Sequence, residues 1–599
     1  MSRFYRTHGK VLIDQSRNQR AKKLVGGLCK RDKLLSEKRR GCLPPAFIEN
    51  HYNQSVSDRS SSRTHVRCPA VFIYHEKQYL LTLALFRSSD DALPHIIQTQ
   101  HKDKTMSTAV QTQVLNGRMN GHTHSLNGDA HAHNGTNGDT SSWAEQFLPM
   151  PLKIDDKIRA QKIEARLRDV VLDGNVLRQV VKVFEDELEH GLRMEPSSLQ
   201  MENTYVPELP DGTEEGVFLA LDLGGTNFRV LLLELRAGQL VREQVEQYHI
   251  NNELRVGTGV ALFNFLADCV QDFVMKLGME NEEFSLGFTF SFPMKQHSIL
   301  SGELITWTKS FKCGGLEGVD VAALLQQCLR DRGLNITVRV LLNDTTGTLV
   351  AGAHIDPQVA IGVILGTGSN GCYMERASRV KHWEAAHDRI KDVCVDIEWG
   401  AFGDNGCLDF IRTEFDNEVD ARSLLATSFT FEKYISGKYL GDVLSVTLGG
   451  LAKDNLFPAA PIPGSLETQD LSLFEKENCE GEVKSTLEVL REKCGCPTIS
   501  HTDALVAQHV AHVVSNRSAQ LVSVCISTLL RRIDRPHVVV AVDGSVFKHH
   551  PRIASLMDKY ISLLAPKKSF TLMGAEDGSG KGSALTAAIA ARIAKRDSS

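Results

Sequence analysis

Residues 219–229 read Leu-Ala-Leu-Asp-Leu-Gly-Gly-Thr-Asn-Phe-Arg, and no other stretch says more about the fold. The apolar run over residues 217–223 predicts a buried strand, and residues 228–234 predict a second one. Gly224 and Gly225 lie between them and permit a tight reversal, because glycine adopts backbone conformations that other residues avoid. Glycine also lets backbone N–H groups approach phosphate oxygens closely. The stretch therefore predicts a hairpin whose turn is suited to cradle a phosphate.

Polar residues surround this turn. Thr226 and Asn227 add side-chain donors, and Arg229 is a candidate partner for a negative charge. Asp222 is suited to hold Mg²⁺ through water, since a magnesium ion favours one or two carboxylates together with phosphate oxygens. On these residues alone, an ordinary hairpin turn with no ligand remains an alternative.

A second strand end carries a carboxylate of a different kind. Residues 341–347 read Leu-Leu-Asn-Asp-Thr-Thr-Gly and follow an apolar strand at residues 338–342. Proteins of α/β class bind ligands at the carboxyl ends of their strands. Asp344 in that place can accept a hydroxyl proton during phosphoryl transfer. It can equally cap a helix that begins at Thr345, and the two interpretations are balanced here.

Three more glycine-rich turns follow predicted strands. They are residues 366–370, residues 543–545 and residues 576–582, the last ahead of an alanine-rich helix. The last turn is not a Walker A loop, because Lys581 is followed by glycine instead of serine or threonine. Together with the first hairpin, these turns indicate a nucleotide held between two related α/β folds.

Length, composition and charge narrow the class of protein. The chain has 599 residues, 42% of them apolar, and a formal net charge of -5. This net charge gives no reason to expect a surface that binds nucleic acids or membranes. Its 13 cysteines are irregularly spaced, which indicates reduced thiols in a cytosolic protein. We expect no membrane-spanning helix, since no run of about 20 apolar residues lacks charges.

The chain changes character near residue 142. Residues 1–40 carry 13 Lys and Arg but only three acidic residues, which favours a solvated basic tail over an organelle-targeting leader. Residues 116–139 are rich in Asn, Gly, His and Thr and predict a disordered linker. Amphipathic helices are predicted within residues 155–192, and short apolar strands alternate with helices after that. We therefore expect a disordered extension over residues 1–145 and an α/β fold beyond it.

Eight motifs, in this order along the chain, resemble those of the eukaryotic hexokinase family, which includes glucokinase. They are residues 221–230, 287–293, 304–309, 342–345, 366–375, 398–404, 542–545 and 576–582. The resemblance covers roughly residues 155–595. It implies the two-lobed fold of actin and the Hsp70 ATPase, with ribonuclease H-like halves. Residues 146–345 would form the N-terminal region with the small lobe, and residues 346–594 mostly the large lobe.

The resemblance also implies a reaction and a site. The reaction is the ATP-dependent phosphorylation of the 6-hydroxyl of glucose and related hexoses, with Mg²⁺ bound to ATP, Asp344 as the general base and Lys309 beside it. The implied sugar site consists of Ser291, Phe292, Thr308, Lys309, Asn343, Asp344, Asn370, Glu398 and Glu432. The implied ATP site consists of Asp222, Leu223, Gly224, Gly225, Thr226, Asn227, Arg229, Thr367, Gly437, Lys438, Ser579, Gly580, Lys581, Gly582 and Ser583, with Asp222 at the metal. A cytoplasmic monomer or dimer is expected, with mitochondrial association as the weaker alternative.

Three residues depart from the family pattern. Asp396 and Ile397 stand where the family has asparagine and threonine, and Asp396 would add negative charge near the sugar. Phe429 stands where the family has a glutamine that helps to hold the sugar. Losing one such polar contact is expected to weaken binding by about 1–2 kcal/mol. An alternative function is therefore a glucose sensor or regulator that keeps the fold but turns over poorly.

Overall fold

The computed structural model describes residues 139–598, apart from residues 225–226 and 384–390. The predictions made for residues 1–138 lie outside this part. Helix α4 covers Asp139–Glu145, so the predicted disordered extension is wrong for its last seven residues. Trp143 explains the helix, because its ring lies against Phe147 and beneath the guanidinium group of Arg178.

The small lobe (residues 206–342) is built on a five-stranded sheet of order β4-β3-β2-β5-β8. The strands are β2 (Gly216–Leu223), β3 (Asn227–Arg236), β4 (Gln239–His249), β5 (Phe284–Phe290) and β8 (Ile336–Leu342). Strands β2 and β3 form the predicted antiparallel hairpin, and β2, β5 and β8 are parallel. Side chains alternate along β2: Leu219 and Leu221 pack in the small-lobe core, whereas Phe218 and Ala220 face the opposite side. Because both faces are buried, the strand reads as a continuous apolar run.

Short helices and a ribbon complete the small lobe. They are α7 (Asn252–Val256), α8 (Gly259–Lys276), α9 (Val321–Asp331) and the two-stranded ribbon of β6 (Met294–Ser298) and β7 (Ser301–Leu304). Helices α8 and α9 cover the outer face of the sheet, where their apolar residues join the same core.

The large lobe (residues 139–203 and 359–574) has a six-stranded sheet of order β1-β11-β10-β9-β12-β13. The strands are β1 (Glu202–Asn203), β9 (Val359–Leu365), β10 (Ser369–Arg376), β11 (Asp392–Asp396), β12 (His537–Asp543) and β13 (Ser569–Gly574). Strands β9, β10 and β11 are antiparallel neighbours, and β12 lies parallel to β9 and β13. Apart from β1, this is the strand order of the small lobe. The chain thus holds two ribonuclease H-like halves of matching topology, although no motif repeats in its sequence.

Helices cover the large-lobe sheet. They are α5 (Lys157–Leu167), α6 (Gly174–Leu192), α11 (Glu414–Arg422), α12 (Thr430–Ile435), α13 (Leu440–Lys453), α14 (Thr468–Glu480), α15 (Lys484–Lys493), α16 (His501–Arg532), α17 (Ser545–His549) and α18 (Ile553–Leu564). The helices predicted within residues 155–192 are confirmed as α5 and α6. Asp173 caps α6 by accepting two backbone N–H groups, and Leu177, Phe184 and Leu188 are fully buried. Helix α16 is the one described helix long and apolar enough to span a membrane, and that apolar stretch is wholly buried in the protein.

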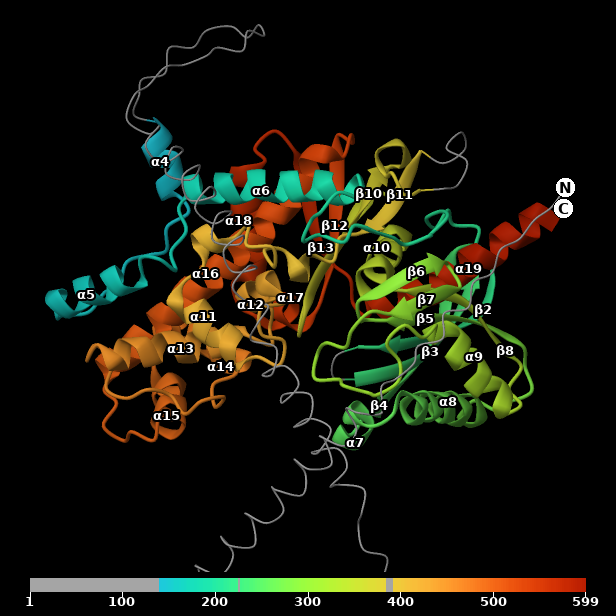
Figure 1. Ribbon diagram of the computed structural model, residues 1–599, viewed down its shortest axis with the longest axis horizontal. Coiled ribbons are helices and arrows are strands. Elements are labelled where there is room, and N and C mark those ends of the chain that lie inside the picture. The colour runs from blue at the N-terminus through green and yellow to red at the C-terminus, as the bar shows by residue number, and fades with distance from the viewer. Residues whose placement is uncertain (1–138, 225–226, 384–390, 599) are drawn as a thin grey trace, which may run out of the picture. The chain divides into compact units, whose positions relative to one another are not determined.

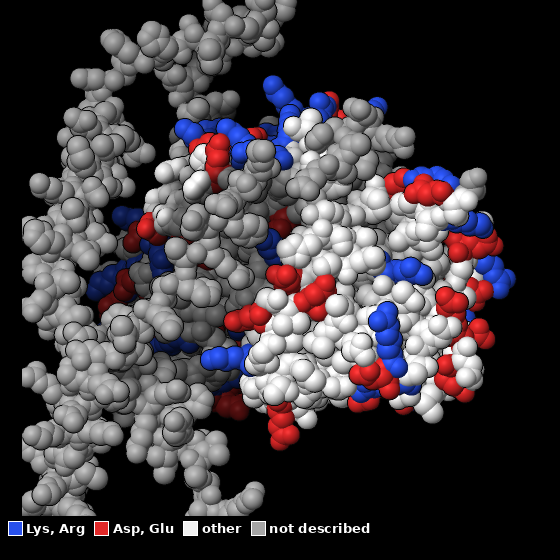
Figure 2. Space-filling view, turned by 45° about the vertical axis from the view of Figure 1, so that its right-hand side comes forward, with Lys and Arg blue, Asp and Glu red and all other residues white. Residues whose placement is uncertain are grey.

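Two junction helices lie between the sheets, α10 (Asp344–Ile355) and α19 (Gly578–Ser598), as Figure 1 shows. Leu349 and Leu585 from these helices pack with Leu342 of one sheet and Ala541 of the other. The C-terminal helix therefore returns to the small lobe after the chain has completed the large one. On the face shown in Figure 2, acidic and basic side chains are interspersed among uncharged ones.

Candidate active site

Carboxylates from three strand ends meet in one cleft. Asp222 ends β2, Asp344 follows β8 at the start of α10, and Asp543 ends β12. All three line a cleft of about 400 Å³, together with the turn between β9 and β10. The turns β2–β3 and β9–β10, which are equivalent in the two halves, both line this cleft, and ligand sites at the carboxyl ends of strands are usual in α/β proteins.

Asp344 faces the cleft instead of capping its helix. The cap of α10 is Asn343, whose side-chain oxygen accepts the N–H of Thr345. The carboxylate of Asp344 is left to accept a hydrogen bond from Lys309 Nζ at 3.2 Å. Lys309 also donates to the carbonyl of Ser291 at 2.8 Å, which holds its ammonium in place. Of the two interpretations that the sequence left balanced, this geometry favours the base.

A second, narrower pocket adjoins the cleft and is lined by residues of both lobes. All nine residues of the predicted sugar site line it: Ser291, Phe292, Thr308, Lys309, Asn343, Asp344, Asn370, Glu398 and Glu432. The hydroxyl oxygen of Ser291 is buried there without a hydrogen-bond partner among the described residues. A buried polar atom without a partner is costly, so this hydroxyl is suited to meet a polar ligand.

Burial raises the pKa of two carboxyl groups in the pocket. Burial is the main cause that raises the pKa of Glu398, and Asp396 and Asp344 raise it further. It also raises the pKa of Glu432, against the opposing charge of Lys309. For Lys309 itself, burial lowers the pKa, but Asp344 and Glu432 outweigh that effect and the net pKa is raised. The ammonium group is therefore held charged beside a cluster of acids.

The backbone of the pocket is strained at three places. Lys309, Glu398 and Phe429 have φ angles of 53°, 55° and 56°, in the left-handed region that non-glycine residues rarely adopt. Such conformations cost roughly 1–3 kcal/mol each and concentrate at functional sites. Three of them around one pocket mark it as functional.

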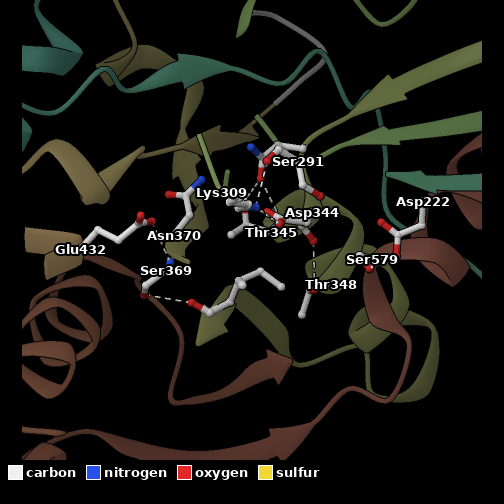
Figure 3. A network of polar contacts seen from close by, with 12 residues as sticks. Asp222, Ser291, Lys309, Asp344, Thr345, Thr348, Ser369, Asn370, Glu432 and Ser579 are labelled. Carbon is white, nitrogen blue, oxygen red and sulfur yellow. Dashed lines mark hydrogen bonds and ion pairs between the residues drawn. The ribbon is translucent and has the colours of Figure 1, made fainter. Parts of the chain in front are cut away.

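Asp222, Gly224, Arg229, Thr367 and Ser579 of the predicted ATP site line the cleft. Figure 3 shows Asp222 and Ser579 on one side of Asp344, and Asn370 and Glu432 on the other. Arg229 pairs with Asp222 and Asp577, and Ser579 donates to Asp222 at 2.8 Å. The nearby Asp222 is the main reason that the pKa of Arg229 is raised. This side of the cleft offers a cation and a hydroxyl to an anionic ligand.

Other members of the predicted ATP site are not brought to the cleft lining. Leu223 packs in the small-lobe core, and the backbone N–H of Lys438 donates to the carbonyl of Thr367 at 3.0 Å. Gly437 lines an adjoining pocket with Thr367. Gly580, Gly582 and Ser583 lie between α10 and the small-lobe sheet, and Lys581 pairs with Glu243 at 3.1 Å. Gly225 and Thr226 lie outside the described residues, as does the side chain of Asn227.

Several residues of the cleft were not predicted. Asp543, Gly544, Ser545, Lys548 and His549 line it. The glycine-rich turn at residues 543–545 was the available signal, yet none of its residues was assigned to the site. The adjoining pocket of about 540 Å³ is lined in part by Thr468, Gln469, Ser472 and Lys476 of α14. No sequence motif marks these four, because they share only a helix face that the fold turns toward the cleft.

The cleft fits a magnesium ion that is bound mainly to phosphate. The carboxylates of Asp222 and Asp543 come from opposite lobes, and both are oxygen ligands of the type Mg²⁺ takes. Within residues 139–598, outside the two gaps, no group of three or more His, Cys, Asp or Glu is placed to hold a metal by itself. The donor set therefore suits a cation that arrives with a nucleotide and keeps several waters.

The three departures from the family pattern have different settings. Ile397 is fully buried in the large-lobe core. Phe429 lines the pocket, with its ring beside Gly400. Asp396 does not line the pocket but lies behind it, bonded to Asn370.

Fold and site together define a two-lobed protein of the actin- and Hsp70-like kinase class, with two adjoining pockets that are lined by charged and polar side chains. Two hexokinase family models match the chain, over residues 162–354 and 360–589. The chain belongs to the hexokinase family.

Individual relatives agree with this assignment. Mouse hexokinase-1 is 40% identical over 72% of this chain and 46% of its own length, and human hexokinase-2 is 38% identical over 73% and 49%. The chain thus spans about half the length of the curated relatives it matches. A solved structure of Schistosoma mansoni hexokinase complexed with glucose is 36% identical, with a TM-score of 0.69, over 73% of this chain and all of that one.

Proposed function

We propose that this chain is an ATP-dependent hexokinase that phosphorylates the 6-hydroxyl of glucose and related hexoses, giving hexose 6-phosphate for glycolysis. The observation that carries the proposal is that Asp344 and Lys309 line both the sugar pocket and the phosphate cleft. An acceptor hydroxyl and a donor phosphate held in these two spaces would meet at this pair (Figure 3). The glucose bound to the Schistosoma mansoni relative supports the choice of sugar.

Asp344 acts on the acceptor in this proposal. It takes the proton of the 6-hydroxyl as that oxygen attacks the terminal phosphorus of ATP. The new oxygen–phosphorus bond forms while the bond from that phosphorus to the bridging oxygen breaks, and ADP leaves. Lys309 at 3.2 Å keeps the Asp344 carboxylate oriented, and its charge favours the negative charge that develops on the transferring group.

The nucleotide would lie across the cleft into the adjoining pocket of α14. Magnesium, when bound with ATP, would neutralise phosphate charge, and Asp222 and Asp543 would hold it through water. Arg229 and Ser579 would contact phosphate oxygens from the small-lobe side. Closure of the lobes over the sugar would exclude water, which a base next to ATP would otherwise activate.

The first test compares wild type with Asp344→Asn in a coupled assay for glucose 6-phosphate with MgATP. We expect kcat to fall by a factor of about 10²–10⁴, which is the range for loss of a general base. Glucose should still raise the melting temperature of the variant, because the other pocket residues remain. Asp534→Asn is the matched control, since that carboxylate is 80% exposed on the surface.

The outcomes separate the enzyme from the sensor. Turnover by wild type that collapses in Asp344→Asn alone supports the hexokinase. A wild type that glucose stabilises but that makes no glucose 6-phosphate contradicts it and favours the glucose sensor.

We also propose a cytoplasmic location and a monomeric or dimeric state. The reduced cysteines expected from the sequence support the location, since all cysteines in the described part of the chain are free. Cell fractionation and light scattering test the two statements separately. Recovery with mitochondria, or a mass above that of a dimer, would contradict them.

A further inference from the structure

Asp396 is a buried acid directly behind the sugar pocket. It ends β11 and is 5% exposed. Its Oδ1 atom accepts a hydrogen bond from Asn370 Nδ2 at 2.8 Å and lies 3.3 Å from the hydroxyl of Thr345. The side chain is therefore held from two elements, β10 and α10, while remaining out of the pocket itself.

Each of these two contacts connects Asp396 to an amide side chain that lines the pocket. The first amide is Asn370 itself, whose side-chain oxygen accepts the N–H groups of Gly371 at 2.7 Å and Trp399 at 3.3 Å. Thr345 connects to the other amide, because its hydroxyl donates to Asn343 Oδ1 at 2.9 Å. Asn343 in turn donates to Glu398 at 3.0 Å.

We propose that Asp396 is a positioning residue of the hexose site, which holds the amides of Asn343 and Asn370 in the orientation that meets the sugar and so sets sugar affinity. This inference rests on the proposed function. An amide can turn over and exchange its donor for its acceptor, so a fixed partner behind it decides which atom faces the ligand. Because Asp396 lines neither the sugar pocket nor the cleft, it should act on binding and leave the chemical step nearly unchanged.

The proton of Asp396 decides how completely this network is satisfied. Thr345 has one hydroxyl proton and cannot give it to Asn343 and to Asp396 at once. A protonated Asp396 can donate to Thr345, which then donates to Asn343. An ionised Asp396 draws the Thr345 proton to itself, so the Asn343 amide loses one of its two donors.

Acidic groups surround Asp396 on each element that packs against it. They are Asp344 on α10, Glu398 after β11, Glu202 on β1 and the Cys372 thiol on β10. Burial, together with Asp344 and Glu202, raises the pKa of Asp396 to about 7. The carboxyl group is therefore protonated below neutrality and ionised above it, and sugar affinity should fall as the pH rises through 7.

The test measures glucose affinity by calorimetry without nucleotide, and kcat and KM with MgATP. Asp396→Ala removes the acceptor, so we expect Kd and KM for glucose to rise at least tenfold with kcat within threefold of wild type. Asp392→Asn is the control, because Asp392 begins the same strand and is exposed. It should leave all three constants unchanged.

Asp396→Asn is the conservative variant and keeps the fold testable if alanine does not. It retains an oxygen acceptor but cannot ionise, so its KM for glucose should depend less on pH between pH 6 and pH 8.5 than that of wild type. We expect the wild-type KM to rise several-fold over the same range. The difference between the two profiles reports the ionisation of Asp396 together with its effect on the pKa of Glu398, which Asp396 raises.

Four results would each overturn one of these statements. Superimposable pH profiles of wild type and Asp396→Asn, or a Kd in Asp396→Ala within twofold of wild type, would remove the positioning role. A loss of kcat as large as the rise in KM would make Asp396 part of the chemical step instead. A wild type that binds glucose without turnover would overturn the proposed kinase and leave the affinity measurement to decide on Asp396.

Discussion

At the scale of single residues, neighbours in the chain have separate tasks in this site. Asn343 caps α10, which frees Asp344 for the cleft. Glu398 lines the pocket, whereas Asp396, two positions earlier, lies behind it and accepts a hydrogen bond from the Asn370 amide. The residue type sets the available chemistry, but a shift of one or two positions along the chain changes what the side chain contacts.

Phe429 provides a prediction at this scale. Its ring occupies the pocket wall beside Gly400, where an amide would offer hydrogen bonds to a sugar. Phe429→Gln should lower KM for glucose by about 5- to 30-fold, which corresponds to one gained hydrogen bond of about 1–2 kcal/mol. A glucose titration in the coupled assay measures this. Phe410→Gln is a suitable control, since Phe410 is 41% exposed, and an unchanged KM in Phe429→Gln would show that the pocket does not use that position.

At the scale of elements, buried charges tie the large-lobe helices together. Glu475 of α14 is fully buried and accepts two hydrogen bonds from Arg552, which precedes α18. His512 of α16 lies 3.5 Å from the same carboxylate. Since α14 also lines the pocket that adjoins the cleft, this cluster holds that wall against the lobe.

Removing the carboxylate should loosen these helices. We expect Glu475→Gln to lower the free energy of unfolding by about 3 kcal/mol at pH 7, because Arg552 would remain without its charged partner. Urea unfolding measures the change, with Glu480→Gln as the control on the exposed end of α14. A loss no larger than that of the control would contradict the assigned role.

The same cluster predicts a pH dependence of stability. Burial by itself raises the pKa of Glu475, but the hydrogen bond from His512 and the charge of Arg552 outweigh it and lower the pKa to about 2. Stability from the carboxylate is thus fully present above the ordinary pKa of 4.5 and is lost as the pH falls toward 2. The difference between wild type and Glu475→Gln should shrink over that interval.

At the scale of the whole molecule, the junction helices α10 and α19 connect the two halves. They approach so closely that a Cβ atom added to Gly582 would lie 1.9 Å from the carbonyl oxygen of Gly347. A Cβ at Gly287 of β5 would likewise lie 2.1 Å from the Ser583 carbonyl. Glycine is required at such contacts because backbone meets backbone.

Gly582→Ala should therefore destabilise the protein by about 1–3 kcal/mol, the usual cost of overpacking a core. Chemical denaturation provides the measurement. Gly449→Ala is the control, since the nearest atom to its added Cβ is 3.9 Å away, and alanine in a helix is expected to be neutral or stabilising. Equal stability of the two variants would show that the junction can separate without cost.

Much of the site could be predicted because its motifs are local. The strand–turn–strand at residues 219–229 became β2 and β3, and the nine sugar-site residues all line one pocket. The hairpin and Asp344 carry their signal in a few neighbouring residues, as an apolar strand that ends in polar side chains, whereas the sugar-site residues as a set were implied by the resemblance of short motifs to the hexokinase family. The members of the ATP site that miss the cleft, such as Gly582, belong to a motif whose glycines serve helix packing instead of ligand contact.

The sequence by itself determined the strands, their polar ends and the kind of chemistry available there, because these depend on residue types within one short segment. Only the tertiary structure decided that Asp222, Asp344 and Asp543 share a cleft, that α14 supplies part of a pocket, and that Asp396 lies behind the amides of Asn343 and Asn370. These facts depend on contacts between segments far apart in the chain. Such contacts follow from the packing of two sheets on shared helices, which no local pattern encodes.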